Sequence, residues 1–559
     1  MTINMDRRAF VGSGLAASAL AALAGCKKQG PAAANEGQGS EGAASTAGGK
    51  VFRYYISSPD CIDPYNVNED QGTQVTYCMF DSLTDFDYAA GKLIGKAAES
   101  WEASKDAKKF TFKLVKGATF HNGDPVDSES FKRAWTRVVS PTFGKEKAGV
   151  LDYHLGMVKG HDELLAGDTD EFAGLSCPDE TTFVVELTTA YPDFPYVCAH
   201  PCLGPVPKAA VEDSAAFYKA PIGNGAFMMD GEWVDGQYIN MKRFDKYYGE
   251  PAKIDAVQFN IQKDVETAYR EFTAGNYDKS EVPPAQTAEA LSKYGESEDG
   301  FTATPKHQFL TGEEGSVYYL NMTVTDDTLK DDDVRRAISL AINRQAICDN
   351  LFEGLRKPAD DILPPSIPGY EMGAWKYSHY DKDEAIKLLD KKHPVDGTGK
   401  RDISITLSFN PEGGHKEIME MVQADLEAVG ISVTSDTREW SAILDDYRKG
   451  NSQAGRLGWN ADYPIADNFL YSLFHSKSGD NCSKYSNPKV DKALEDARAI
   501  IDDDKRVAAM TEISKLVGED CPIAPIMYYS HREIASERVA TFVFDAGRHP
   551  HLDTVEMNA

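Results

Sequence analysis

The sequence predicts an α/β fold with several domains, and three observations support this prediction. Strands with period-two alternation and amphipathic helices alternate along the chain after residue 50. Residues 403–409 alternate as a strand, a helical pattern follows, and another strand begins at Ile431, directly after Gly430. This order is typical of a βαβ unit, whose two strands are parallel. Finally, a chain of 559 residues is longer than a domain with a single hydrophobic core usually is, so several domains are expected.

The first part of the chain shows clear strand and helix patterns. Residues 110–114 alternate apolar and polar side chains, as a half-buried strand does, and 183–187 is a second strand candidate. Turns at 117–125 separate the first strand from a predicted helix, which Asp127 or Ser128 is expected to cap. The apolar face of this helix consists of Phe131, Trp135 and Val138.

The later part continues the alternation. Residues 257–261 predict a strand, and 334–351 carry apolar side chains at helical spacing. We expect the aspartate run at 331–333 to cap that helix through its dipole rather than to hold a cation. No repeat and no Gly/Pro/Ser-rich linker interrupts the chain after residue 50, so several short crossings are expected to join the domains.

The composition excludes some partners. Apolar residues make up 42% and charged residues 26% of the chain, as in ordinary globular proteins. The chain has 59 Lys and Arg against 88 Asp and Glu, which gives a net charge of −29. Such a chain repels phosphate backbones, so no nucleic acid partner is expected.

Residues 1–25 predict an export signal peptide. Arg7 and Arg8 precede an uncharged run that is too short and too weakly apolar for a membrane-spanning helix. The run ends in Leu23-Ala24-Gly25-Cys26, which resembles the lipobox of bacterial lipoproteins, so Cys26 is expected to carry a lipid. The paired arginines suit either the twin-arginine or the general secretory route.

Residues 26–49 predict a lipid-anchored flexible tether, because they are rich in Gly and Ala and hold no large apolar side chain. We therefore expect an extracytoplasmic protein that is held to the cell membrane through its N-terminal lipid alone.

Eight cysteines remain after Cys26, and an extracytoplasmic location permits disulfides. Cys198 and Cys202 are close enough in sequence to pair locally, but two buried free thiols explain them equally well. Together with His200 they offer three soft ligands, yet one short loop rarely closes a metal site. We expect no metal and no cofactor.

Motifs of extracellular enzymes are missing. The chain has no Gly-x-Ser-x-Gly element of a serine hydrolase and no His-Glu-x-x-His element of a metalloprotease. Nothing in the sequence favours catalysis, so the prediction is a protein that is not an enzyme.

Several segments resemble one known family over about residues 56–544. They are Asp63-Pro64 with Phe80-Asp81-Ser82-Leu83, Glu99-Ser100-Trp101, the stretch 110–125, Pro205-Val-Pro-Lys208, Gly223-Asn-Gly-Ala-Phe227, 334–344 and Arg456-Leu-Gly-Trp-Asn-Ala-Asp-Tyr-Pro464. Val115 departs from the usual basic residue. The chain is similar to solute-binding family 5, the oligopeptide- and dipeptide-binding lipoproteins of bacterial ABC importers.

The resemblance implies a two-lobed fold of the periplasmic-binding-protein type (type II, cluster C), with three domains and mixed sheets. Domain I is expected at 50–84, 204–308 and 530–559, with domain II inserted at 85–203. Domain III, the second lobe, is expected at 309–529.

The resemblance also implies the site residues. Asp462 matches the aspartate that faces a peptide's α-ammonium, and a turn or helix-capping aspartate is the alternative. Trp459 matches a wall of a side-chain pocket, with a core residue as the alternative. Arg456 and His415 match positions that hold the peptide's carboxylate, although both also suit surface positions.

The ligand's backbone is expected to pair with main-chain edges near Asn68-Glu69 and near Asn460-Ala461, as an added strand would. Asn460 stands where close relatives carry a disulfide-bonded Cys, so that disulfide is not expected here.

The resemblance therefore implies a monomeric binding protein that captures peptides between closing lobes. It would deliver them to the permease and ATPase subunits of an ABC importer. The alternatives are a non-peptide ligand on the same fold, such as a nickel chelate or haem, or a peptide-sensing lipoprotein.

Overall fold

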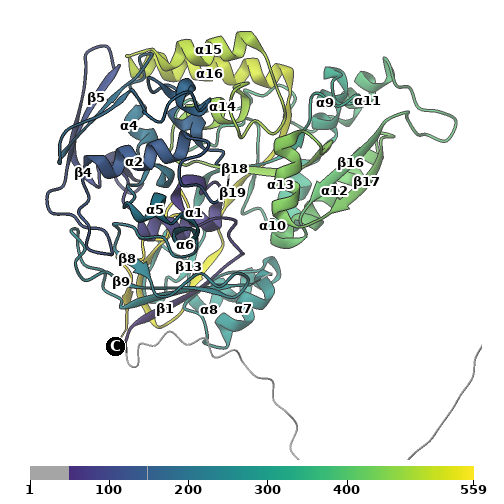
Figure 1. Cartoon of the computed structure of the whole chain (residues 1–559). Coiled ribbons are helices and arrows are strands. Elements are labelled where there is room, and N and C mark those ends of the chain that lie inside the picture. Colours follow the sequence, from purple (N-terminus) through teal and green to yellow (C-terminus); the bar gives the residue numbers. More distant parts are fainter. Residues whose placement is uncertain (1–48, 148, 263, 559) are drawn as a thin grey trace, which may run out of the picture. The chain divides into compact units, whose positions relative to one another are not determined.

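Three larger sheets organise the part of the chain that the structure describes, residues 49–147, 149–262 and 264–558 (Figure 1). The structure is a computed structural model. The predicted signal peptide at 1–25, Cys26 and all of the predicted tether except residue 49 lie outside the described residues.

The first sheet has seven strands and is mixed. Its order is β13-β20-β11-β1-β10-β9-β8, and β1 is parallel to both β10 and β11. The strands are β1 (Val51–Ile56), β8 (Phe227–Met229), β9 (Tyr238–Arg243), β10 (Ala256–Ile261), β11 (Lys279–Glu281), β13 (Phe309–Leu310) and β20 (Glu533–Ala535). Three stretches that lie far apart in sequence thus build one sheet.

A second, antiparallel sheet lies between two of these stretches in sequence. It has the order β4-β5-β7-β6. Its elements are β4 (Ala98–Ala103), β5 (Lys109–Leu114), β6 (Leu175–Asp179), β7 (Thr182–Glu186) and the helix packed on it, α2 (Ser128–Val139). The strands predicted at 110–114 and 183–187 are confirmed. Asp127 caps α2 by accepting from the Ser130 backbone N–H, and Phe131, Trp135 and Val138 are buried as predicted.

The third sheet has six strands in the order β15-β19-β14-β18-β16-β17 and is again mixed. Its strands are β14 (Glu313–Met322), β15 (Lys357–Pro358), β16 (Ser404–Phe409), β17 (Ser432–Thr437), β18 (Ala454–Asn460) and β19 (Ile523–Ser530). Tyr318 and Leu320 pack in one apolar cluster and Val317 and Tyr319 in another, so the two faces of β14 are both covered.

The predicted βαβ unit is confirmed. β16 and β17 are parallel, and α12 (His415–Glu427) connects them. Gly430 adopts a φ of 89°, a conformation that side chains disfavour and that glycine allows at a helix end. Asp331 caps the next predicted helix, as expected.

The helical pattern predicted at 334–351 is confirmed, but it forms two helices and not one. The structure has two helices, α9 (Asp332–Ala341) and α10 (Arg344–Phe352). The backbone is extended at Ile342, and the Asn343 side chain then caps α10 by accepting from the Ala346 N–H. Buried side chains of both helices pack in the same apolar cluster, so the apolar spacing continues across the break and periodicity alone does not reveal it.

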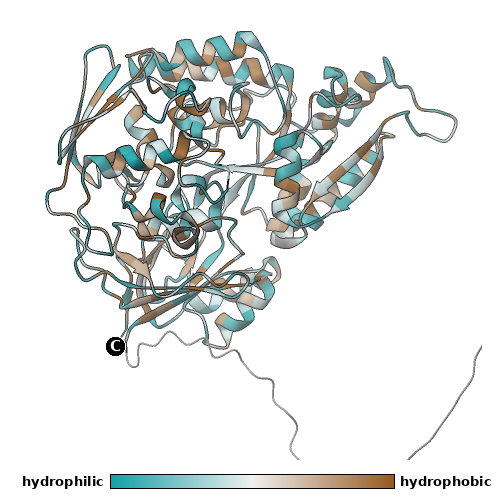
Figure 2. Cartoon of the chain, in the orientation of Figure 1, coloured by the Kyte–Doolittle hydropathy of each residue, from teal (hydrophilic) through white to brown (hydrophobic). Residues whose placement is uncertain are grey.

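The remaining helices and strands complete the described part of the chain. In Figure 2, α15 and α16 show the alternating teal and brown bands of amphipathic helices. The helices are α1 (Asp70–Met79), α3 (His161–Leu165), α4 (Phe194–Val197), α5 (Ala209–Glu212), α6 (Ser214–Lys219), α7 (Val265–Thr273), α8 (Thr287–Tyr294), α11 (Lys382–Asp390), α13 (Trp440–Lys449), α14 (Ala466–Phe474), α15 (Pro488–Arg498) and α16 (Asp503–Asp520). The strands are β2 (Thr84–Asp87), β3 (Lys92–Gly95), β12 (Thr302–Ala303), β21 (Val539–Val543) and β22 (Glu556–Met557).

Two segments that carry the family resemblance meet in space. The Asn224 side-chain amide donates to the backbone oxygen of Asp81 and accepts from its N–H, both at 3.0 Å. A Cβ at Gly223 would lie 1.9 Å from the carbonyl oxygen of Met79, which explains the glycine. These contacts tie the first stretch of the seven-stranded sheet to the second.

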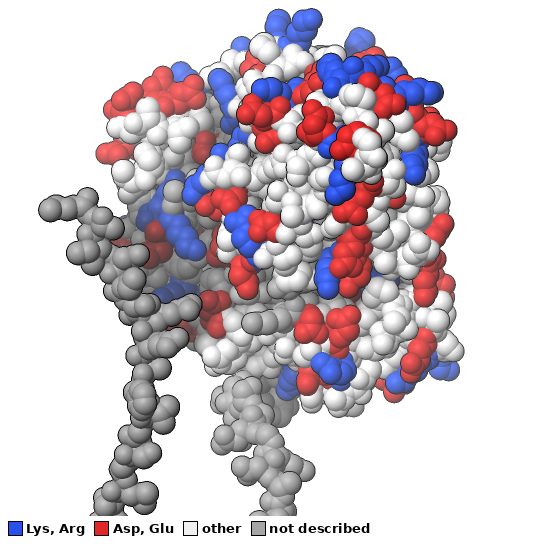
Figure 3. Space-filling view, turned by 90° about the vertical axis from the view of Figure 1, so that its right-hand side faces the viewer, with Lys and Arg blue, Asp and Glu red and all other residues white. Residues whose placement is uncertain are grey.

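Charged side chains of both signs lie on the face that Figure 3 shows. On this face, acidic and basic side chains are interspersed. Within the described residues, no helix combines the length and the apolar character that a membrane crossing requires.

A buried ion pair ties the start of the fold to α2. Both guanidinium Nη atoms of Arg137 lie 2.6 Å from the carboxylate of Asp63, and both side chains are almost completely buried. Breaking such a pair leaves an uncompensated buried charge.

We expect Arg137→Met to lower the free energy of unfolding by about 3–5 kcal/mol in urea denaturation. The control Lys492→Met removes an exposed pair with Asp496 and should cost less than about 1 kcal/mol. Equal losses would contradict the role of the buried pair.

All eight cysteines among the described residues are free, so Cys198 and Cys202 are buried thiols rather than a local disulfide. Burial raises the pKa of the Cys198 thiol, which slows its reaction.

For a protein that starts at residue 27, we expect DTNB in guanidinium to count eight thiols without prior reduction. In the native state, we expect the same thiols to be labelled far more slowly. A count below eight that reduction restores would show a disulfide.

Candidate functional site

A cavity of about 500 Å³ lies where residues of the first and third sheets meet loop residues from the second sheet's stretch of chain, such as His154 and His200. All eight residues that the sequence predicts for the ligand site line it: Asn68, Glu69, His415, Arg456, Trp459, Asn460, Ala461 and Asp462. Residues more than 350 positions apart in sequence therefore border one cavity, which is the candidate site.

Strand β18 presents an open edge to this cavity. Its residues pair with β14 from Ala454 to Asn460 on one side, but on the other side β16 pairs only with Ala454 and Gly455. Among the described residues, no strand covers that side of 456–460. The seven consecutive residues 456–462 all line the cavity, although side chains alternate between the two faces of a strand. The edge of the strand, and not one face, therefore borders the cavity.

Asp462 lies just beyond this strand and is held by Asn468 of α14. The Asn468 amide donates to the Asp462 carboxylate at 2.8 Å, and its oxygen accepts from the Asp462 backbone N–H at 3.1 Å. The same oxygen accepts from the Trp459 indole N–H at 3.0 Å. Asn468 is fully buried, so one amide fixes the positions of both predicted site residues.

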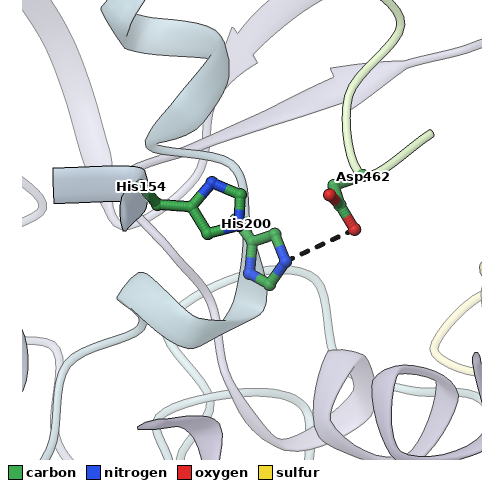
Figure 4. Close-up of side chains that lie close together, drawn as sticks. All are labelled: His154, His200 and Asp462. Carbon is green, nitrogen blue, oxygen red and sulfur yellow. Dashed lines mark ion pairs between the residues drawn. The ribbon is translucent and has the colours of Figure 1, made fainter. Parts of the chain in front are cut away.

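Two histidines face Asp462 from the second sheet's stretch of chain, as Figure 4 shows. The His200 Nε2 atom lies 3.4 Å from a carboxylate oxygen of Asp462. Burial alone would raise the pKa of Asp462, but His200 and the Asn468 hydrogen bond outweigh it and hold the pKa below its ordinary value. Asp462 is therefore a carboxylate, and 24% of its side chain is exposed.

The geometry of His154, His200 and Asp462 would also suit a metal ion, since their ligand atoms lie within 4.8 Å of one another. The hydrogen bonds argue otherwise. The His200 Nδ1 atom accepts from the Cys202 backbone N–H at 3.0 Å, which leaves the proton of a neutral ring on Nε2. A protonated Nε2 donates to Asp462 and has no lone pair for a metal. His200 is thus a positioning group for the carboxylate, and neither Cys198 nor Cys202 joins it in a ligand set.

The other predicted residues differ in their partners. The Arg456 guanidinium stacks 4.0 Å from the Trp440 ring and donates to Asn410. Burial and the neighbouring arginines hold the pKa of His415 well below its ordinary value, so His415 is neutral and Arg456 is the cation of the pair.

At the other predicted edge, the Glu69 carboxylate caps α1. It accepts from the Gly72 N–H at 2.6 Å and the Gln71 N–H at 2.9 Å. The adjacent Asn68 side chain is buried from water at both its amide atoms and has no partner in the structure. Asn68 is therefore the better placed of the two to bond a ligand.

Sequence reasoning missed His154 and Asn468. His154 lies in a 3-10 turn (Asp152–Leu155) with no motif around it, and its Nε2 is buried without a partner. Asn468 follows the resembling segment by only a few residues, but an Asn in a helix gives no signal of its own. His200 was noticed only as a metal candidate.

The buried His154 gives a pH-dependent prediction. Burial lowers its pKa to about 3, against an ordinary value near 6.5. The folded state then binds fewer protons than the unfolded state, so this residue costs stability as the pH falls from 6.5 towards 3. We expect His154→Gln to gain stability relative to the wild type across that range in urea denaturation at pH 7, 5.5 and 4.5. The exposed His379→Gln is the matched control. A difference between His154→Gln and wild type that does not change with pH would contradict the buried neutral ring.

Comparison with known proteins agrees with this architecture. The family model described as "Bacterial extracellular solute-binding proteins, family 5 Middle" matches residues 92–481. The periplasmic oligopeptide-binding protein OppA of Haemophilus influenzae is 28% identical over 491 residues, which cover 85% of this chain and 87% of that protein. The probable deoxycholate-binding periplasmic protein YgiS of Escherichia coli K12 is also 28% identical, with 86% and 88% covered.

Solved structures share the fold. The Haemophilus influenzae OppA complex with RPPGFSPFR superposes with a TM-score of 0.78 at 26% identity, and covers 91% of this chain and 99% of that one. The murein tripeptide binding protein MppA of Escherichia coli gives a TM-score of 0.81 at 23% identity, and the match covers 91% of this chain and 99% of that one. The predicted periplasmic-binding-protein fold with mixed sheets is confirmed, and the chain belongs to the bacterial extracellular solute-binding proteins of family 5.

Proposed function

We propose that the protein is the lipid-anchored, extracytoplasmic peptide-binding component of an ABC importer. The observation that carries the proposal is the open edge of β18, which borders the cavity along 456–460 and ends next to the Asp462 carboxylate. An extended peptide can pair with such an edge through main-chain groups, which do not depend on its side chains.

Asp462 supplies the site for the peptide's α-ammonium. A carboxylate in a cavity with little water attracts an ammonium more strongly than a surface carboxylate does. Asn468 and His200 hold Asp462 in place, while part of its side chain stays accessible. Trp459, fixed by the same Asn468, forms the neighbouring wall.

Arg456 supplies the site for the peptide's carboxylate, with neutral His415 as a hydrogen-bonding neighbour. Arg456 lies four residues before Asn460 on β18, or roughly 13 Å at the rise of a strand, and Asp462 at most about 20 Å away. A peptide of about four to six extended residues spans this separation.

The relatives support the ligand class. Four of the similar proteins are named as oligopeptide-binding, and the Haemophilus influenzae structure is a complex with the nonapeptide RPPGFSPFR. In this proposal the predicted domains I, II and III form two lobes that close on the peptide, and the closed form meets a permease with its ATPase subunits. The protein acts as a monomer and performs no chemistry on the ligand.

Calorimetry with a random pool of short peptides tests the proposal. We expect saturable binding to the pool and none to deoxycholate, nickel chelate or haem under the same conditions. Binding of one of those three ligands without binding of peptides would overturn the peptide assignment and leave the fold unaffected.

The ammonium site has its own test. Asp462→Asn keeps the shape of the side chain and removes its charge, so peptides with a free N-terminus should bind about 10- to 100-fold more weakly. N-acetylated peptides, which lack the ammonium, should lose little. Asp496→Asn, an exposed surface change, is the matched control. Equal losses for free and acetylated peptides would remove the ammonium role.

A further inference from the structure

We propose that the cavity holds a site for two negative charges near Arg456, and that its preferred ligands are peptides whose C-terminal residue is Asp or Glu. This inference rests on the proposed function and adds a class of ligand to it. The second cation is Arg356, which neither the sequence motifs nor the family resemblance singled out.

Most cations of the cavity are already neutralised. Five lysines and arginines line it: Lys279, Arg356, Arg448, Arg456 and Arg548. Three of them face carboxylates of the protein, in the pairs Lys279–Glu533 at 2.7 Å, Arg448–Asp480 at 3.7 Å and Arg548–Asp70 at 2.9 Å. Neither Arg356 nor Arg456 has a carboxylate within 4.0 Å among the described residues. Two positive charges of the cavity are therefore left for a ligand.

Arg356 is held in place without an ion pair. Its guanidinium lies 4.1 Å from the centre of the Phe352 ring and 4.6 Å from that of Tyr529. The two rings fix its direction through cation–π contacts. Its Nε atom is buried and has no hydrogen-bond partner, so the group is incompletely satisfied without a ligand.

A chain of ring contacts connects Arg356 with the predicted carboxylate site. The Tyr529 and Tyr318 rings lie 5.9 Å apart, and Tyr318 and His415 lie 5.6 Å apart. The Tyr318 hydroxyl and the His415 Nδ1 atom are also buried without partners. Arg356, Arg456 and His415 all line the cavity, and burial together with the two arginines lowers the pKa of His415. Unsatisfied polar atoms and unpaired cations thus gather at one end of the cavity.

The acidic residues around this end form no close ion pair with Arg356 or Arg456 in the described part of the chain. Asp70, Asp480 and Glu533 pair with other cations of the cavity, and Glu281 lies 4.0 Å from Arg532. Arg548 and, less strongly, Arg356 hold down the pKa of buried Glu314, whose close partner is Arg548 at 2.7 Å. The Glu69 carboxylate is engaged by backbone N–H groups at the start of α1, and Glu439 is exposed before α13. Neither forms an ion pair with an arginine in the described part of the chain.

Charge balance then selects the ligand. An uncompensated charge that loses its water is costly, so a closed complex favours one negative charge for each unpaired guanidinium. The α-carboxylate of a peptide supplies one, and its ammonium is matched by Asp462. A C-terminal Asp or Glu supplies the second carboxylate within the same residue, and the planar guanidinium geometry suits both.

Matched peptides test this inference. Calorimetry compares Ala-Ala-Glu with Ala-Ala-Gln, together with the same pair at lengths of two, four and five residues. We expect the wild type to bind the Glu peptide at least tenfold more tightly than the Gln peptide at the preferred length. Arg356→Met should make the two affinities equal within threefold. Lys357→Met, which removes the neighbouring exposed cation that pairs with Glu313, should keep the preference.

Equal affinities of the wild type for the Glu and Gln peptides would overturn the inference and leave the peptide-binding function intact. A preference that survives in Arg356→Met would overturn the assignment to Arg356. If no peptide of any length binds, the proposed function fails and this inference fails with it. Thermal melts of each variant show whether a loss of binding reflects a loss of folding.

Discussion

The buried amide of Asn468 is the constraint on which the candidate site depends. It bonds the carboxylate and the backbone of Asp462 and the indole of Trp459 at once. A flexible aspartate beyond the end of a strand would lose conformational entropy when it met a ligand, whereas this one is already oriented. His200 adds a donor from a separate stretch of chain, and its own orientation is set by the Cys202 N–H.

The six-stranded sheet gives this site its rigidity. Apolar clusters cover both faces of the sheet around β14. β18 pairs with β14 along its whole length, and its first residues are buried. Only the far side of 456–460 lacks a strand, and the cavity lies there. An edge left open in the interior of a protein is a rare arrangement, because unpaired backbone groups are costly when buried. A bound peptide would satisfy those groups, which connects the fold to the proposed function.

Much of this architecture could be predicted from the sequence. The strands at 110–114 and 183–187, the cap at Asp127 and the unit around Gly430 follow from local patterns, and the structure confirms them. The break between α9 and α10 could not be predicted, because it depends on a side-chain cap within a continuous apolar pattern. The eight predicted site residues line one cavity. They were predicted from the family resemblance, because local sequence patterns alone do not single them out. Asn468, His154 and Arg356 carry no local signal. Their roles arise from contacts between distant segments, which one sequence does not reveal.

The central claim is that Asp462 receives the ammonium of an extended peptide that lies along the open edge of β18. A crystal structure of the protein with a bound short peptide tests it most directly. The account predicts the peptide nitrogen within hydrogen-bond distance of the Asp462 carboxylate, main-chain bonds to 456–460 and the C-terminus towards Arg456. A peptide bound in the reverse direction, or away from β18, would contradict it.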